Sequence, residues 1–146
     1  MLKNLALMFI FVCLPLVAFA QETPVGKWKT IDDETKREKS LVEITETDGK
    51  LSGKILEVFK NEGETVDTLC TKCEGAKKDQ PIVGMTFLWD LQPKGDEWTG
   101  GRILDPKNGK EYSAKIKVVE NGARLKVRGF LGISLLGRSQ TWERAK

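Results

Sequence analysis

The sequence predicts an all-β fold, an eight-stranded antiparallel up-and-down barrel. Three observations predict it. Gly-containing turns such as Asp48-Gly49 interrupt the chain at short intervals, and no helical period is sustained between them. Apolar and polar residues alternate in the segments between these turns, most regularly over 111–119, as in half-buried strands. Eight such segments follow one another, and eight strands close a sheet around an interior that side chains fill or one small ligand occupies.

The expected strands are short and are joined mostly by hairpin turns. One long irregular segment, 60–83, is rich in charge, and loops of this length are usually functional or mobile. A second irregular segment, 129–137, is apolar on nearly every side and precedes the last strand. The eight strands are expected at 26–31, 40–45, 51–59, 85–91, 98–104, 111–119, 124–129 and 138–144.

The N-terminus has the pattern of an export signal. A positive charge precedes an apolar run, 5–19, which ends in a small-x-small cleavage site at Ala20. We expect residues 1–20 to be a cleaved signal peptide and residues 21–146 to form one barrel domain. A retained anchor is the alternative, but the run is short for a membrane span. The pattern therefore predicts a periplasmic or secreted protein with no transmembrane segment after signal removal.

Composition argues against several classes of function. The net charge of +3 is too small to indicate a nucleic-acid partner, and export argues further against one. His is absent, which removes the commonest general base and the commonest metal ligand. No motif pairs a nucleophile with a base. We therefore expect no enzymatic activity, no cofactor and no metal site.

Two cysteines remain after signal removal. Cys70 and Cys73 lie in the long segment, and an even pair in an exported chain predicts a disulfide that staples this loop. A redox-active pair is the alternative, because a Cys-x-x-Cys motif can lower a thiol pKa. A metal site would require two further soft ligands.

An aromatic set lies on faces that the alternation predicts to point inward. These side chains are candidates for the walls of a ligand pocket. The alternative is a packed core, because small barrels fill their own interiors. The set consists of Trp28, Phe87, Trp89, Tyr112 and Trp142.

Segment 129–137 and a row of basic residues are candidate contact surfaces. The segment could be a lid, an exposed docking patch or a buried plug, and we favour the plug or lid because an exposed patch promotes aggregation. The basic row is predicted on outward strand faces, where it could meet anionic glycans or lipid head groups or simply keep the strands soluble. It comprises Lys115, Lys117, Arg124, Lys126 and Arg128.

Two resemblances follow from motifs. Gly26-Lys27-Trp28 is similar to the Gly-x-Trp signature of lipocalins and the wider calycin group, which implies a lipocalin-like barrel. In that group a basic residue near the end of the last strand packs over the Trp, a role that Arg138 or Arg144 could fill as the barrel-closing basic residue.

The second resemblance covers nearly the whole mature chain. It implies an exported small domain and carries no activity or catalytic residue. The chain resembles the bacterial envelope family called domain of unknown function 2147, and the resemblance lies in a series of short motifs that occur in a fixed order along the chain. These motifs are Gly26-Lys27-Trp28, Cys70-Thr71-Lys72-Cys73, Pro81-Ile82-Val83-Gly84-Met85, Leu88-Trp89, Gly100-Gly101, Lys126-Val127-Arg128-Gly129 and Gln140-Thr141-Trp142.

Together these patterns predict a non-enzymatic binding module for a small apolar or amphipathic ligand in the bacterial envelope. The alternative is a protein-interaction, inhibitor or envelope-assembly module that acts through loops on a filled barrel. The volume of the interior separates the two hypotheses. Neither the ligand nor a protein partner is identified by the sequence.

Overall fold

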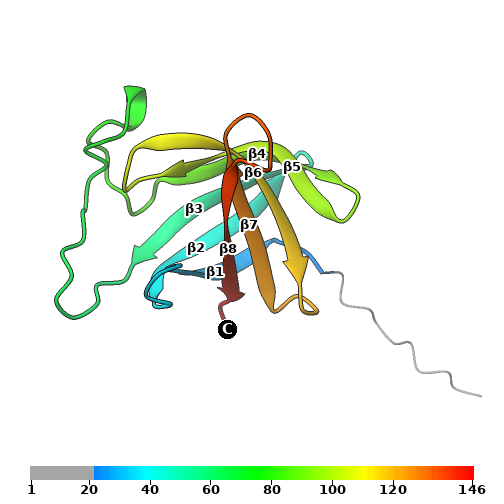
Figure 1. The fold of residues 1–146 in the computed structure, drawn as a ribbon, viewed down its shortest axis with the longest axis horizontal. Coiled ribbons are helices and arrows are strands. Elements are labelled where there is room, and N and C mark those ends of the chain that lie inside the picture. Colours follow the sequence, from blue (N-terminus) through cyan, green and yellow to red (C-terminus); the bar gives the residue numbers. More distant parts are fainter. Residues whose placement is uncertain (1–21) are drawn as a thin grey trace, which may run out of the picture.

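The structure is a computed structural model that describes residues 22–146; the predicted signal peptide lies outside the described residues. Eight strands pair antiparallel in chain order, and the first also pairs with the last, so the sheet is a closed barrel (Figure 1). The predicted eight-stranded up-and-down barrel is therefore confirmed. Within residues 22–146 no helix is long and apolar enough to span a membrane.

The strands agree with the predicted segments to within a few residues at each end. The Asp48-Gly49 turn has positive φ at both residues, 52° and 74°, as a tight hairpin requires. A short 3₁₀ turn, η1, spans Gly75–Lys77 in the long loop. The strands are β1 Gly26–Ile31, β2 Glu38–Thr47, β3 Lys50–Val58, β4 Thr86–Lys94, β5 Glu97–Asp105, β6 Lys110–Val119, β7 Arg124–Phe130 and β8 Gly137–Arg144.

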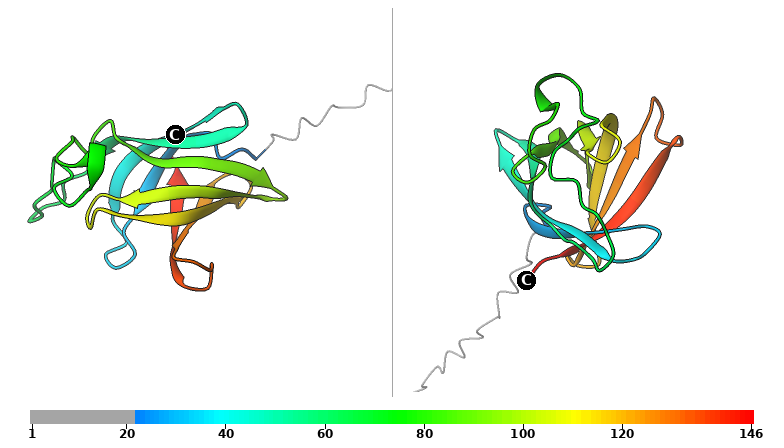
Figure 2. Two further views of the ribbon diagram at one scale, coloured as in Figure 1. Left: turned by 90° about the horizontal axis from the view of Figure 1, so that it is seen from above. Right: turned by 90° about the vertical axis from the view of Figure 1, so that its left-hand side faces the viewer.

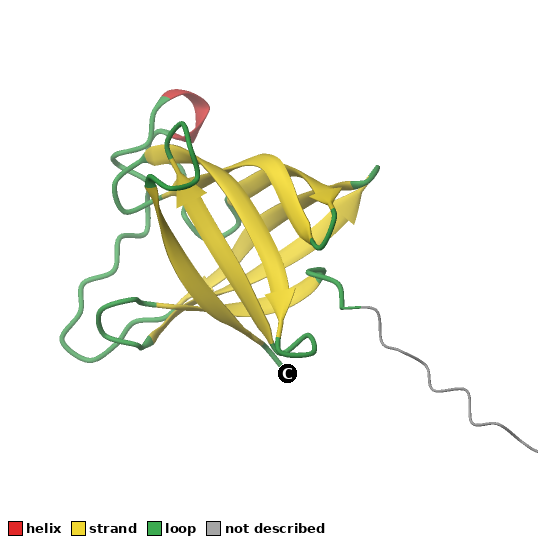
Figure 3. Cartoon of the chain, turned by 45° about the vertical axis from the view of Figure 1, so that its right-hand side comes forward, coloured by secondary structure: helices red, strands yellow, loops and turns green. Residues whose placement is uncertain are grey.

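The up-and-down order divides the connections between two ends of the barrel. The connections β2–β3, β4–β5 and β6–β7 lie at one end with the two described chain ends, and we call this end the closed pole. The connections β1–β2, β3–β4, β5–β6 and β7–β8 lie at the other end, which we call the mouth. Figure 3 shows the strands wrapping around the barrel between these two sets of loops.

The longest connection, β3–β4, leaves the barrel at the mouth (Figure 2). Its base is tied to β3, because Gly84 N–H donates to the Ile55 carbonyl at 2.7 Å and Ile55 N–H donates to the Met85 carbonyl at 3.0 Å. Further along the loop, Cys70 and Cys73 form a disulfide, and both residues are buried. The disulfide segment therefore packs as part of the structure.

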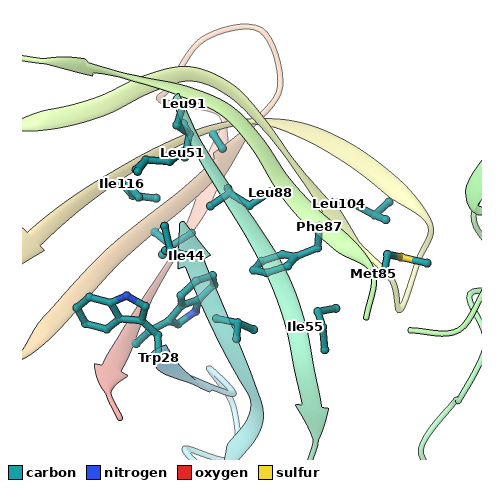
Figure 4. Close-up of a cluster of buried hydrophobic side chains, with 14 of the residues drawn as sticks. Trp28, Ile44, Leu51, Ile55, Met85, Phe87, Leu88, Leu91, Leu104 and Ile116 are labelled. Atoms are coloured by element: carbon teal, nitrogen blue, oxygen red, sulfur yellow. The ribbon is translucent and has the colours of Figure 1, made fainter. Parts of the chain in front are cut away.

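The core fills the closed half of the barrel. Residues near the closed-pole ends of the strands, such as Leu51, Leu91 and Leu125, are fully buried. Figure 4 shows this cluster, with Trp28 and Ile44 among the inward-pointing side chains. The inward-pointing apolar side chains of the strands thus fill the closed half of the barrel.

Strand β4 departs from simple alternation. Its pairing with β3 shifts register on both sides of Gly53, and Asp90 has a φ of 60°. These irregularities bring Phe87 and its neighbour Leu88 both into the core. They leave Trp89 paired with the exposed Arg102 on the outer face. The predicted inward orientation of Trp89 is therefore wrong, because β-bulges reset the inside-outside alternation.

Candidate ligand-binding site

A cavity of about 740 Å³ extends from the mouth into the barrel. This volume falls in the usual range of small-molecule sites, about 300–1,000 Å³. Residues from all four mouth connections contribute to it. Its deeper wall is mostly apolar and includes Val42, Ile55, Ile82, Phe87, Ile103 and Val127.

The cavity ends before the closed pole, which Trp28 plugs. The Trp28 side chain is fully buried, and its indole N–H donates to the Pro24 carbonyl at 2.8 Å. The Arg144 guanidinium covers the ring, with Cζ 4.1 Å from the ring centroid. A cation over an indole face is attracted by the ring quadrupole. Of the two basic residues considered, Arg144 is the one that lies over Trp28.

Arg138 lies at the opposite end of β8, at the mouth. It forms a salt bridge with Asp33 of the β1–β2 connection, and it contributes to the cavity lining. The hydrogen bond from Arg138 to Asp33 raises the pKa of the guanidinium further above its usual value. The pair therefore links two mouth loops.

Trp142 separates the plug from the cavity. It is buried, and its ring centroid lies 5.9 Å from that of Phe87. Its indole N–H donates to Gln140 Oε1 at 3.0 Å, which satisfies its single polar atom. Gln140 itself lines the cavity. Trp142 thus forms core beneath the cavity floor and is not one of its lining residues.

Two of the five predicted aromatic residues line the cavity, Phe87 and Tyr112. Tyr112 reaches toward the mouth, where its hydroxyl accepts a hydrogen bond from Asn108 Nδ2 at 3.0 Å. Space beside its ring arises at Gly129, where an added Cβ would lie 3.5 Å from Tyr112 Cβ and 3.4 Å from Ile103 Cγ2. The absence of a side chain at this position widens the cavity.

Trp89 lies outside the cavity and instead anchors the long loop. The Lys77 ammonium is 4.1 Å from the centroid of the Trp89 ring. Lys77 belongs to η1, close to the disulfide. Trp89 is therefore a docking point for the disulfide segment on the outer face of β4.

The rim of the cavity is polar and carries both signs of charge, with Lys39, Glu64 and Asp105 among its residues. In the β1–β2 connection, Asp32 Oδ1 accepts hydrogen bonds from the Thr35 N–H at 2.8 Å and the Thr35 hydroxyl at 2.9 Å. These two hydrogen bonds lower the pKa of Asp32 below its usual value, and the bond from the Thr35 backbone N–H has the larger effect. The charged carboxylate therefore fixes the shape of this rim loop.

The apolar segment before β8 is also part of the rim. Leu131 and Leu136 line the cavity where it opens, yet they are 60% and 67% exposed. Ile133 and Leu135 between them are 59% and 83% exposed. Of the two favoured alternatives the buried plug is wrong, because these side chains are largely exposed to solvent. The lid stays a prediction. The segment is an exposed rim loop.

Several lining residues were missed in the sequence. Val42, Ile55 and Val127 line the cavity but were not among the predicted site residues. Nothing local distinguishes an inward residue near the mouth from one near the closed pole. Only the position along the strand relative to Trp28 separates them, and that depends on the complete register.

A closed eight-stranded barrel with a buried Trp plug, a basic residue over it and one open end is a lipocalin-like fold. The solved structure of protein HP1028 from Helicobacter pylori, described as belonging to the lipocalin family, matches this chain with a TM-score of 0.70. The match covers 84% of this chain and 82% of that chain at 21% identity, so it shows a shared fold.

The chain belongs to the family DUF2147, described as an uncharacterized protein conserved in bacteria, whose model matches residues 26–144. No curated protein matches the chain. Both resemblances predicted from the sequence are thereby confirmed.

Proposed function

We propose that this protein is an exported, non-enzymatic binding protein of the bacterial envelope that holds a small amphipathic ligand in its barrel. The observation that carries the proposal is the cavity of about 740 Å³, which opens at the mouth and ends on a sealed core. A cavity of this size favours ligand binding over a module that acts through loops on a filled barrel.

The distribution of polarity supports an amphipathic ligand. The deeper wall is formed by aliphatic and aromatic side chains. An apolar chain or ring bound there would be removed from water, which is favourable, and it has no polar groups that would lose hydrogen bonds to water. The charged residues that line the cavity lie in or beside the mouth loops, for example Asp105 and Arg138. A polar head group would therefore remain at the rim, where it meets hydrogen-bonding partners and water.

Native mass spectrometry of protein purified from its own host tests whether a ligand co-purifies. Binding of the apolar fluorophore N-phenyl-1-naphthylamine tests the cavity directly. Gly129→Leu places a side chain beside Tyr112 and should weaken probe binding at least about tenfold, which corresponds to about 1.4 kcal/mol.

The matched control is Thr141→Leu, because Thr141 is an exposed residue of the neighbouring strand β8. It should bind the probe as the parent does. Circular dichroism establishes that both variants keep the barrel. Equal probe binding by Gly129→Leu and the parent would contradict the proposal, as would the absence of both probe binding and a co-purified ligand.

A further inference from the structure

The rim loop between β7 and β8 holds its apolar side chains outward in a defined shape. Leu131 N–H donates to the Leu136 carbonyl at 3.0 Å, and Leu136 N–H donates to the Ile133 carbonyl at 3.0 Å. From β7, Arg128 Nε donates to the Ser134 carbonyl at 2.6 Å. The exposure of four aliphatic side chains is therefore built by hydrogen bonds at the tip of this hairpin.

The same hairpin carries positive charge only. Between Glu120 and Glu143 the sequence contains no Asp or Glu, while Arg124, Lys126, Arg128 and Arg138 fall in this interval. The apolar tip is thus flanked by an arginine on each strand, Arg128 before it and Arg138 after it, of which Arg138 is paired with Asp33.

The outer face of the adjoining strands adds to this charge. Lys115 of β6 lies opposite Arg128, and Lys117 lies opposite Lys126. Like charges directly opposite each other on neighbouring strands reduce stability. Glu97 and Asp96 partly neutralise the β6 lysines. In the part of the chain that the structure describes, no acidic side chain lies within salt-bridge distance of Lys126 or Arg128.

We propose that the β7–β8 hairpin docks the mouth of the barrel onto an anionic lipid bilayer. The aliphatic tip would enter the boundary between head groups and acyl chains. A small apolar surface that is followed by cations on the side away from the bilayer is suited to this depth. Arg128 lies three residues from the tip residue Leu131, and Lys126 lies about 7 Å further along β7. Both cations then stand within about one Debye length of the head groups.

A second copy of the chain fits this surface less well. A stable interface buries about 800 Å² on each partner, far more than four aliphatic side chains at one hairpin tip provide. A symmetric contact would also bring the same basic strands of two copies together. Anionic lipids complement the charge and accept a narrow tip, and each juxtamembrane cation contributes favourably there.

The inference goes beyond the proposed ligand site and does not depend on it. Leu131 and Leu136 line both the tip and the cavity opening, so a docked barrel would present its mouth to the bilayer. Ile133 and Leu135 do not line the cavity. Substitutions at these two positions therefore test docking without altering the ligand site.

Flotation of the purified protein with phosphatidylcholine vesicles, with and without one-third phosphatidylglycerol, provides the first test. The expected result is binding to the anionic vesicles that weakens as salt is raised. The double variant Ile133→Ser/Leu135→Ser should bind at least about tenfold more weakly. Lys126→Gln should bind about fivefold more weakly, the effect of one cation near the surface.

Two matched controls use the same chemistry elsewhere. Val83→Ser removes an apolar side chain that is 53% exposed in the long loop, and Lys54→Gln removes an exposed cation on β3. Both should bind vesicles as the parent does. Equal losses in the controls and the hairpin variants, or binding that ignores phosphatidylglycerol, would overturn the inference.

An environment-sensitive nitrobenzoxadiazole label locates the contact. Attached at Leu135→Cys it should shift to the blue with anionic vesicles, whereas at Lys50→Cys, the first residue of β3 at the closed pole, it should not. No shift at position 135 would overturn the inference. So would concentration-dependent dimerisation, seen by analytical ultracentrifugation without lipid and lost in Ile133→Ser/Leu135→Ser, because it identifies a second copy as the occupant.

Discussion

Arg144 and Trp28 face each other across the strand pair that closes the barrel. They are register partners between β1 and β8, and the guanidinium lies 4.1 Å from the centroid of the indole. The same guanidinium donates to the carbonyls of Gly122 at 2.6 Å, Thr23 at 2.7 Å and Val25 at 3.2 Å. One side chain thus connects the N-terminal segment, the β6–β7 turn and the last strand.

Arg144→Ala should lower the free energy of unfolding by about 3 kcal/mol, because it removes charge-assisted hydrogen bonds and leaves carbonyls at the closed pole without their donor. Urea denaturation followed by tryptophan fluorescence measures the loss. The matched control is Arg138→Ala, which removes an exposed ion pair and should cost less than about 1 kcal/mol. Equal losses in the two variants would show that Arg144 does not clamp the closure.

Gly101→Ala should destabilise the barrel by about 3 kcal/mol. An added Cβ would lie 2.3 Å from the Trp89 carbonyl oxygen and 2.7 Å from the Leu91 nitrogen, so the β4 backbone would have to move. Gly129→Ala is the matched control, because its Cβ meets only side-chain atoms at 3.4 Å or more and should cost less than about 1 kcal/mol. Thermal unfolding compares the two, and a stable Gly101→Ala variant would show that the strands can separate there at little cost.

Asp32 should make the stability of the β1–β2 loop dependent on acid pH. Its pKa in the folded protein is lowered from 3.8 by the hydrogen bonds from Thr35, so the carboxylate stabilises the folded state fully above about pH 4. That stabilisation is lost as the pH falls below 3.8 and through the lowered folded pKa. Asp32→Asn should therefore be less stable than the parent at pH 7, and the difference should shrink in acid.

Unfolding by urea at several pH values checks this dependence. Glu62→Gln, an exposed residue of the long loop, is the control and should follow the parent at every pH. A stability difference between Asp32→Asn and the parent that stays constant from pH 7 down to pH 2 would contradict the assignment.

Reduction of Cys70–Cys73 should leave the barrel folded and loosen only the disulfide segment. The ring is short, with a sequence separation of 3, so the chain-entropy model gives it only about 2 kcal/mol. The loop base keeps its own bonds to β3, such as Gly84 N–H to the Ile55 carbonyl at 2.7 Å. Hydrogen exchange should rise in residues 66–82 and remain unchanged in the strands. Cooperative unfolding on addition of reductant would contradict this.

The strand order and the closed barrel could be predicted because turn chemistry and alternation are local signals. The Asp48-Gly49 hairpin and the alternation of β6 illustrate both. The orientation of Trp89 could not be predicted, because it depends on an irregular pairing with β3 and on the conformation of Asp90, which no motif marks. Gly101 on the neighbouring strand β5 is a sequence feature related to this irregularity, because it lets the β4 backbone approach closely. That close approach becomes evident only when β4 and β5 are paired.

The candidate site was predicted less well than the fold. Alternation identifies inward faces, but Trp28 and Phe87 share that property while one is the plug and the other lines the cavity. The exposure of Leu135 could not be predicted either, since burial is the usual fate of an apolar run. A hairpin tip beyond the end of the sheet has no opposing layer to bury it.

The pairing of the first strand with the last bears on how the protein matures. Until Arg144 has emerged, β1 has only one partner strand, and its second edge remains free to pair with other chains. In the export that we propose, the N-terminus would leave the translocation channel first, so ring closure would await the arrival of β8. Nascent chains that stall late in transport should accordingly be more prone to misassembly than those that have been fully released.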